Sequence, residues 1–206
     1  MRTETSTLLT VALLAGIAAP TAHGNIVLNP SFEQSPTSET FSSWVSSNVE
    51  RMGPFIDSYD GNQSVDLAKA KSGFLQQQLI TIPGETYQLE FYLSANIYSF
   101  RELPRQARVL WGGMSLGLFT WLQLGTEQPA EARFEQHLIY NLVAPTNRTI
   151  LRFEDVSATS GFGAVLDAVS VTLMPEPEPE TIPSPAALPG GILLGLAVLT
   201  RRKTTA

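Results

Sequence analysis

The sequence contains no cysteine among its 206 residues. This absence excludes disulfides, thiol nucleophiles, and zinc or iron–sulfur sites with cysteine ligands. Basic residues are also few: 13 Lys and Arg stand against 19 Asp and Glu, and the net charge is −6. Because binding to a nucleic-acid backbone needs clustered Lys and Arg, this balance excludes a nucleic-acid partner.

Catalytic motifs give little support for an enzyme, since the sequence has no H-E-x-x-H. Its G-x-S-x-G match at Gly113–Gly117 begins in a Gly-Gly turn and continues into a predicted strand, whereas a nucleophilic serine of this motif needs a turn from a strand into a helix. His137 is the only histidine beyond residue 24, and its polar neighbours in the alternating pattern predict that it faces water. A glycosidase needs a carboxylate pair. The available carboxylates are expected to scatter over exposed strand faces: Asp57, Asp66, Glu90, Glu135, Glu154 and Asp155. We therefore predict no catalytic residue. A hydrolase with a carboxylate pair stays open as an alternative, because such a pair leaves no local motif.

The first 24 residues have the pattern of a signal peptide. Arg2 precedes an apolar run over residues 8–19, and Ala22 and Gly24 offer the small side chains that signal peptidase accepts. The run would form a helix of roughly 18 Å, too short for a hydrocarbon core of about 30 Å. We predict a cleaved signal over residues 1–24; an N-terminal membrane helix is the alternative.

The composition changes again after residue 174. Residues 175–185 are rich in Pro and Glu and predict an extended, acidic spacer. Residues 186–199 are apolar but short for a membrane span, and a basic cluster follows them. We predict a short apolar helix over 186–199 within a sorting or anchoring segment over 186–206.

This tail resembles the PEP-CTERM class of bacterial sorting domains, in which a Pro-x-Pro motif precedes an apolar helix and an arginine cluster. The motif falls either on residues 175–177 or on Pro183 and Pro185, and the second directly precedes the apolar stretch; Arg201 and Arg202 form the cluster. The resemblance implies transient contact with the inner membrane and cutting by an exosortase-type enzyme. It further implies export to the envelope, surface or extracellular matrix of a Gram-negative-type bacterium. A permanent membrane anchor is the alternative.

Residues 25–174 predict one β-sandwich domain. Within Gln76–Asn96, a Pro83-Gly84 turn joins an aliphatic stretch to Tyr87, Leu89, Phe91 and Leu93, which alternate with polar residues and predict a strand with one buried row. We expect an antiparallel strand pair there. The other predicted strands are Ile26–Leu28, Phe41–Val49, Pro54–Ser58, Gln63–Leu67, Ala107–Trp111, Ser115–Leu122, Ala132–Val143, Thr149–Glu154 and Ala164–Leu173. About ten strands without an amphipathic helix predict an all-β, two-sheet antiparallel β-sandwich of the jelly-roll type.

The order of several landmarks resembles choice-of-anchor C proteins. These landmarks are the motif Asn29-Pro-Ser-Phe-Glu33, an early Trp44, a Gln-rich strand that runs into Pro-Gly-x-x-Tyr, and a closing Val165–Val171. The resemblance implies a galactose-binding-like jelly roll, the fold of many carbohydrate-binding modules. Pro30 replaces the usual Gly, and Ala168 replaces the second residue of a usual Asp-Asp pair.

The same resemblance implies a structural calcium ion held by Glu33 and Asp167, where the first and last strands meet. A hard cation prefers several oxygen ligands. Asp167 lies in a row with Val165 and Val169 that is expected to face the core, where a carboxylate needs a partner. The alternatives are that Glu33 caps a turn and that Asp167 accepts backbone N–H groups.

Aromatic residues suggest where a sugar would stack. We expect Trp44 in the core, and regard Trp111, Trp121, Tyr92 and Tyr98 as candidates for ligand binding. The sequence thus predicts an exported, non-catalytic surface or matrix module that associates with glycans or exopolysaccharide. A polysaccharide hydrolase and a protein-binding adhesive scaffold without sugar affinity are the alternatives.

Overall fold

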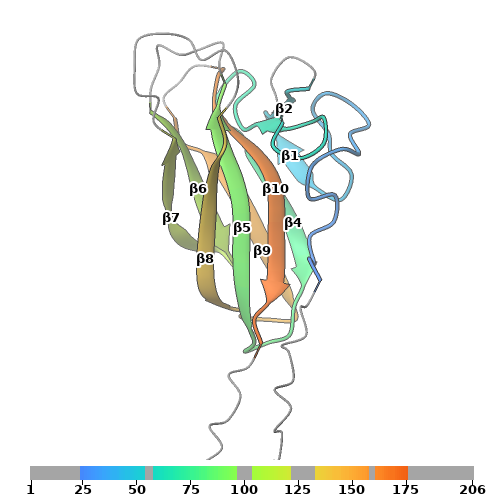
Figure 1. Cartoon of the computed structure of the whole chain (residues 1–206), viewed down its shortest axis with the longest axis vertical. Helices are drawn as coiled ribbons and strands as arrows, with labels where there is room; N and C mark the ends of the chain where they lie inside the picture. The colour runs from blue at the N-terminus through green and yellow to red at the C-terminus, as the bar shows by residue number, and fades with distance from the viewer. Residues whose placement is uncertain (1–23, 54–57, 97–103, 122–132, 158–160, 176–206) are drawn as a thin grey trace, which may run out of the picture. The chain divides into compact units, whose positions relative to one another are not determined.

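A computed structural model of the chain describes residues 24–53, 58–96, 104–121, 133–157 and 161–175. These residues form ten strands in two five-stranded sheets (Figure 1). The strands are β1 (Val45–Ser47), β2 (Glu50–Arg51), β3 (Val65–Asp66), β4 (Phe74–Ile80), β5 (Thr86–Ala95), β6 (Arg105–Trp111), β7 (Met114–Trp121), β8 (Glu135–Val143), β9 (Arg148–Asp155) and β10 (Ala164–Leu173).

The first sheet has the strand order β1-β4-β9-β6-β7, and the second sheet has the order β2-β3-β10-β5-β8. Figure 1 shows β10, β5 and β8 in front of β4, β9, β6 and β7, so the two sheets pack face to face. The described residues contain no helix, and hence none long and apolar enough to cross a membrane. The predicted fold class, an all-β antiparallel sandwich of the jelly-roll type, is confirmed.

The core follows the period-two alternation of β5. Tyr87, Leu89, Phe91 and Leu93 are each at most 2% exposed, as their spacing predicted. The ring of Phe91 packs edge-to-face on Phe153 of β9, with ring centroids 5.2 Å apart, and so links the two sheets. Fully burying one such side chain stabilises the fold by roughly 1.5–3 kcal/mol. This row therefore forms the centre of the hydrophobic core.

Strands β4 and β5 do not pair with each other, and the predicted antiparallel pair is wrong on this point. β4 pairs with β1 and β9 in the first sheet, whereas β5 pairs with β10 and β8 in the second. The Gly84 N–H donates to the Ala144 carbonyl at 2.9 Å, so the turn is tied to the end of β8. A Pro-Gly dipeptide specifies a reversal of direction, but not the sheet that the chain enters next.

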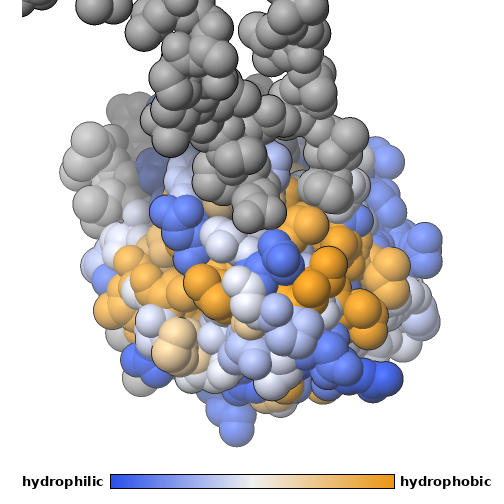
Figure 2. Space-filling view, turned by 90° about the horizontal axis from the view of Figure 1, so that it is seen from below, coloured by the Kyte–Doolittle hydropathy of each residue, from blue (hydrophilic) through white to orange (hydrophobic). Residues whose placement is uncertain are grey.

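The end of the sandwich at this crossover exposes apolar side chains, which Figure 2 shows interspersed with polar ones. Ile80 at the end of β4 and Ile82 in the turn are both more than half exposed, as is Val143 at the end of β8. Apolar side chains exposed one at a time are ordinary at strand ends. The same end carries Gly112 and Pro145, which border a pocket on the first sheet.

A β-bulge changes which side chains of β8 face the core. The pairing of β8 with β5 shifts register, and Asn141 in the shifted segment has a φ of 60°. On the N-terminal side of the bulge, His137 lies opposite Phe91 with the rings stacked at 5.0 Å, while Leu138 points to solvent. The prediction that His137 faces water is therefore wrong. Its burial lowers the pKa of the imidazole below the ordinary value.

A second bulge reverses the alternation of β10. The pairing with β5 shifts after Asp167, and Ala168 has a φ of 47°. Val169 belongs to the core, whereas Asp167 lies opposite Tyr92 on the outward face of the second sheet. The predicted core-facing row is wrong for Asp167, yet its side chain is fully buried because the turn at Tyr59–Gln63 covers it.

Two predicted strands are shorter than expected, and one is not formed. Phe41–Val49 and Gln63–Leu67 contain only β1 and β3, and residues 26–28 are not a strand, although the Ile26 N–H donates to the Val171 carbonyl. Most of Pro54–Ser58 lies outside the described residues. Residues 1–23 and 176–206 also lie outside them, so the signal peptide, spacer and sorting tail stay predictions.

Ala168 provides a test of the bulge in β10. A side chain in the left-handed region costs about 1–2 kcal/mol, and glycine avoids this cost while losing part of the gain to chain entropy. We expect Ala168→Gly to raise the free energy of unfolding by about 0.5–1 kcal/mol, measured by urea unfolding. Ala70→Gly is the matched control, because Ala70 has no positive φ and should lose stability. Equal losses in both variants would contradict the assignment of the bulge.

Candidate functional site

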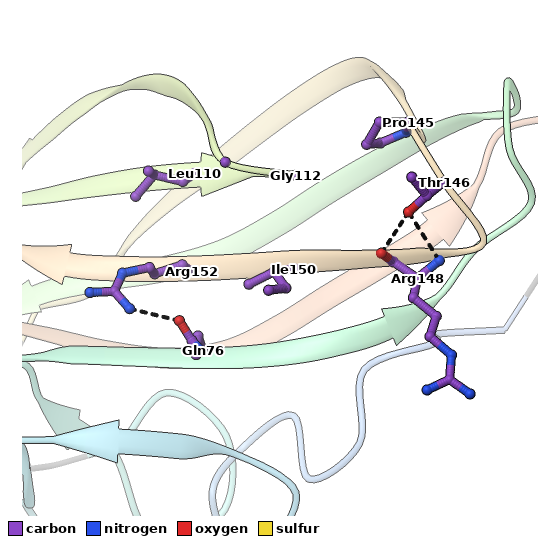
Figure 3. A pocket seen from close by; sticks show the side chains of 9 residues that line it. Gln76, Leu110, Gly112, Pro145, Thr146, Arg148, Ile150 and Arg152 are labelled. Atoms are coloured by element: carbon purple, nitrogen blue, oxygen red, sulfur yellow. Dashed lines mark hydrogen bonds between the residues drawn. The ribbon is translucent and has the colours of Figure 1, made fainter.

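A pocket of about 400 Å³ lies on the outward face of the first sheet, where β4, β9 and β6 run side by side. We call it the β9 pocket, because β9 contributes three of its side chains (Figure 3). Its described lining residues are Gln76, Leu110, Gly112, Gly113, Pro145, Thr146, Arg148, Ile150 and Arg152.

The alternation of β9 places its side chains in the pocket. Thr149, Leu151 and Phe153 are buried between the sheets, so Arg148, Ile150 and Arg152 point outward. The register brings two further lining residues beside Arg152, with Gln76 of β4 on one side and Leu110 of β6 on the other. The pocket is therefore assembled from cross-strand neighbours that lie far apart in the sequence.

Arg152 is held in a fixed position by three contacts. Its Nη1 donates to Gln76 Oε1 at 2.6 Å, and its Nε donates to Glu154 Oε1 at 2.6 Å. The guanidinium carbon also lies 3.6 Å from the centroid of the Phe74 ring, a cation–π contact. These contacts use only two of the five N–H donors of the guanidinium, so others are left for a ligand.

Arg148 is much less constrained. Its side chain is exposed, and its Nη1 lies 3.5 Å from Gln78 Oε1, at the limit of a hydrogen bond. The Thr146 hydroxyl accepts from the Arg148 backbone N–H and donates to its carbonyl, which fixes the backbone of the strand where it leaves the turn. Arg148 is thus a positioned cation with a movable head at the mouth of the pocket.

The floor and rim of the pocket are apolar. Leu110 and Ile150 lie between the polar groups, and Pro145 closes one side. Gly112 has a φ of 57°, and a Cβ there would lie 2.7 Å from Pro145 Cγ, so this approach requires glycine. The described lining contains no carboxylate, histidine or other general base. The arrangement offers hydrogen bonds, charge and apolar surface for binding, but no group for acid–base chemistry.

The two residues predicted to hold calcium both contact the Tyr59–Gln63 turn. Glu33 Oε1 accepts the N–H groups of Asn62 and Gln63, each at 2.7 Å. Asp167 Oδ2 accepts those of Tyr59 and Asp60 at 2.7 and 3.0 Å, and its Oδ1 accepts from Ala168. These are the alternatives that the sequence left open. N–H donors occupy the oxygens that calcium would use, so the arrangement fits a capped turn better than a metal site.

The described residues contain no group of three or more His, Cys, Asp or Glu side chains placed to hold a metal ion. Among these residues, the pair of Glu33 and Asp167 therefore has no third Asp, Glu or His side chain placed to complete a site. Calcium stays a prediction, and its binding would require the turn to release its N–H groups.

Tyr92 of the predicted ligand-binding residues is part of the same region. Its ring stacks on Tyr59 with centroids 3.5 Å apart, and its hydroxyl donates to Glu90 Oε1 at 2.9 Å. Tyr59 is 52% exposed, so the stack presents an aromatic edge to solvent on the second sheet. Tyr98 lies outside the described residues.

The tryptophans are core residues. Trp111 and Trp121 are 2% and 4% exposed, and their indole N–H groups donate to the carbonyls of Val143 and Arg133. Because both rings are enclosed, neither offers a face on which a sugar can stack. Trp44 is also buried, as predicted, and its N–H donates to the Asn29 carbonyl.

Two of the carboxylates expected on exposed faces are buried instead. Asp66 Oδ1 accepts the N–H groups of Ala68 and Gly163, while Asp155 Oδ1 accepts from the Ser157 hydroxyl and from the Ala164 N–H. The expectation is wrong for both, because these side chains fasten the start of β10 instead of facing water. Burial raises the pKa of Asp66 to about 7 and also raises that of Asp155. Asp57 lies outside the described residues.

The β9 pocket was not predicted from the sequence. Its polar side chains come from a Gln-rich strand and from Arg148 and Arg152, whose spacing of four residues places them on one face of β9. The predicted strand Thr149–Glu154 contained Arg152 but began one residue after Arg148. The spacing of the arginines thus indicated one face of β9, but it gave no information on the strands beside β9. The pairing of β9 with β4 and β6, which completes the pocket, has no local trace in the sequence.

The buried carboxylates predict an unusual pH dependence of stability. Burial raises the pKa of Asp66 and of Asp167 from 3.8 to about 7, so the folded state binds more protons than the unfolded state between pH 4 and 7. Stability should therefore fall as pH rises through this window, by roughly 2–4 kcal/mol for each fully affected carboxyl. Urea unfolding from pH 5 to 8 measures the slope, and Asp66→Asn should flatten it. A free energy of unfolding that increases from pH 5 to 8 would contradict this prediction.

Comparisons with known proteins define the fold but not a family. No protein-family model matches the chain, and no curated protein sequence matches it. Among solved structures, the chain is similar to a cyclase from Fischerella sp. TAU in complex with 4-(1H-indol-3-yl)butan-2-one, at 14% identity and a TM-score of 0.52, over 75% of this chain and 98% of that chain. It is similar to the K2 cleaved adhesin domain of Lys-gingipain at 11% identity and a TM-score of 0.50, over 76% of this chain and 99% of that domain. It is also similar to the carbohydrate-binding module TmCBM61 in complex with β-1,4-galactotriose, at 18% identity and a TM-score of 0.49, over 74% of this chain and 99% of that module.

Proposed function

We propose that this protein is a non-catalytic glycan-binding module and that the β9 pocket holds the sugar. The supporting observation is the pairing of planar hydrogen-bonding groups with an apolar floor: Gln76 and Arg152 are hydrogen-bonded to each other beside Leu110 and Ile150. A sugar ring presents hydroxyl groups at its edge and C–H groups on its faces. Such a pocket matches both surfaces at once.

The size and rigidity of the pocket suit this task. A volume of about 400 Å³ lies within the range of small-molecule sites, toward its lower end. Arg152 is already fixed by Gln76, Glu154 and Phe74, so binding a ligand costs little side-chain entropy. Preorganisation of this kind increases affinity without any additional contact.

A hydrolase is the second candidate, and the fold alone does not decide against it, since a cyclase has a similar fold. Of the carboxylates considered, Asp66 and Asp155 are buried and committed to backbone N–H groups. Glu154 lies beside the pocket lining, where it is paired with Arg152. A glycosidase needs a second carboxylate across the cleft, and the described lining of the β9 pocket contains none.

We further propose that the module is exported and sorted. The support is compositional: a short apolar run ahead of Ala22 and Gly24, and an acidic Pro-rich spacer, an apolar segment and an arginine cluster after residue 174. The likeness of this tail to PEP-CTERM domains, and of the middle to choice-of-anchor C proteins, supports a location at an envelope or matrix after processing by an exosortase-type enzyme. Mass spectrometry of the exported protein checks this, because two intact termini would contradict it.

Gln76 tests the glycan-binding proposal. We expect Gln76→Ala to weaken binding to a glycan on an array by roughly 5–30-fold, since it removes one hydrogen-bonding group and loosens Arg152. Gln136→Ala is the matched control, because Gln136 is an exposed glutamine on the other sheet, bonded to Glu90.

Three other outcomes distinguish the alternatives. Release of reducing sugar that is lost on substitution of a carboxylate would show a hydrolase. Equal binding by both glutamine variants would show that the sugar lies elsewhere than in the β9 pocket. No retention on any glycan, together with capture of a protein partner, would show an adhesive scaffold without sugar affinity.

We also propose that Glu33 and Asp167 bind calcium when it displaces the N–H groups that their oxygens accept in the structure, and this proposal has a direct test. If calcium replaces the N–H groups at Glu33 Oε1 and Asp167 Oδ2, its removal by EDTA lowers the melting temperature, and Glu33→Gln abolishes the difference. Glu39→Gln is the control, since Glu39 is exposed and paired with Lys69. Equal melting temperatures with calcium and with EDTA would overturn the proposal and leave both carboxylates as caps of the turn.

A further inference from the structure

We propose that the β9 pocket recognises an anionic glycan, one whose sugars carry carboxylate or sulfate groups; this inference rests on the proposed glycan-binding function. The chain as a whole has a net charge of −6, with 19 acidic residues against 13 basic ones. The described lining of the pocket has the opposite balance, with Arg148 and Arg152 and no Asp or Glu. The pocket is therefore a local cationic site on an acidic protein.

The excess of positive charge extends over the outward face of the first sheet. On β4, β9, β6 and β7, the charged side chains that point outward are Arg108, Arg148, Arg152 and a single carboxylate, Glu154. Glu154 is shared, because it accepts from Arg152 Nε at 2.6 Å and lies 3.6 Å from Arg108 Nη1. One carboxylate thus offsets one of three guanidinium charges, and an anionic ligand would meet a net attraction.

Arg148 is the arginine on this face that is not paired with Glu154. Within the described part of the chain it has no carboxylate partner, and its guanidinium makes only the long hydrogen bond to Gln78. A guanidinium is always charged and presents paired donors that match the two oxygens of a carboxylate or of a sulfate. Its exposed head is free to turn toward a ligand, because nothing in the described structure holds it elsewhere.

The spacing of the two arginines points to a chain of sugars. Arg148 and Arg152 are four residues apart on one strand, so their backbone positions are separated by about 13 Å along the face. Ile150 lies between them, as Figure 3 shows, and provides an apolar step. A single sugar ring is shorter than this backbone separation, so with both side chains directed outward each arginine would contact a different acidic sugar of a polysaccharide. Arg152 supplies a fixed anchor and Arg148 an adjustable one.

The experiment compares glycans that differ only in charge, using the full chain. Polygalacturonate is paired with its fully methyl-esterified form, and dextran sulfate is paired with dextran; binding is measured by affinity electrophoresis. We expect retention by at least one charged member, with much weaker retention by its neutral counterpart. The polygalacturonate and dextran sulfate arms distinguish a carboxylate from a sulfate as the recognised group. Raising NaCl from about 50 to 500 mM should weaken this binding several-fold.

Arg148→Gln is the decisive variant, and Arg133→Gln is its matched control. Both remove one exposed arginine and change the net charge equally, but Arg133 lies outside the β9 pocket. We expect Arg148→Gln to weaken binding to the charged glycan about 5–10-fold and Arg133→Gln to leave it nearly unchanged, at the same urea midpoint of unfolding. Equal effects of the two variants would overturn the inference, because they would show nonspecific charge attraction.

The inference and the underlying function fail in different ways. Equal binding of charged and neutral glycans, with a loss in Gln76→Ala but none in Arg148→Gln, would overturn the anionic specificity and retain glycan binding at the pocket. Absence of binding to every charged and neutral glycan tested would overturn the proposed function itself, and the inference with it.

Discussion

Buried carboxylates that accept backbone N–H groups hold the loops of this sandwich to its sheets. Asp66 of the second sheet and Asp155 of the first accept the N–H groups of the consecutive residues Gly163 and Ala164. The two sheets are thereby tied together where β10 begins, in a chain that has no cysteine for a disulfide. The fit is close, since a Cβ at Gly163 would lie 2.8 Å from Asp66 Oδ1. Several hydrogen bonds offset part of the cost of burying each such carboxylate, and the rest raises its pKa.

The same device explains the residues that the resemblance assigned to calcium. Glu33 and Asp167 contact the Tyr59–Gln63 turn from two distant parts of the chain, and backbone N–H groups take the place of a cation. Both arrangements tie the first loop to the last strand, so either one satisfies the same structural need. A carboxylate in this position is consequently weak evidence for a metal when only the sequence is known.

Local alternation was enough to predict the strands whose period of two is regular, and prediction failed where that period is interrupted. The buried row of β5, the burial of Trp44 and the bounds of β10 agreed with the apolar spacing. The orientations of His137 and Asp167 did not agree with this spacing, because a single bulge residue in each strand reverses the faces. The bulge residues, Asn141 and Ala168, lie within otherwise regular alternating patterns, so the patterns alone did not indicate a bulge. The burial of Asp66 and Asp155 was missed for another reason: the segment at Gly163 and Ala164 that binds both carboxylates is brought there by the fold, and the alternation of each strand carries no sign of it.

The pocket shows how register brings distant side chains together in such a fold. Gln76, Leu110 and Arg152 become neighbours only because β9 pairs with β4 and β6 in one particular register. A slip of one residue in β9 would turn Arg148, Ile150 and Arg152 inward and bring Leu151 and Phe153 to the surface, at a cost of several kcal/mol in lost burial. The hydrophobic core on one face of β9 thus fixes the arginines on the other. The side chains on the outward face can change by substitution without disturbing the fold, since the core, and not the pocket, sets the register.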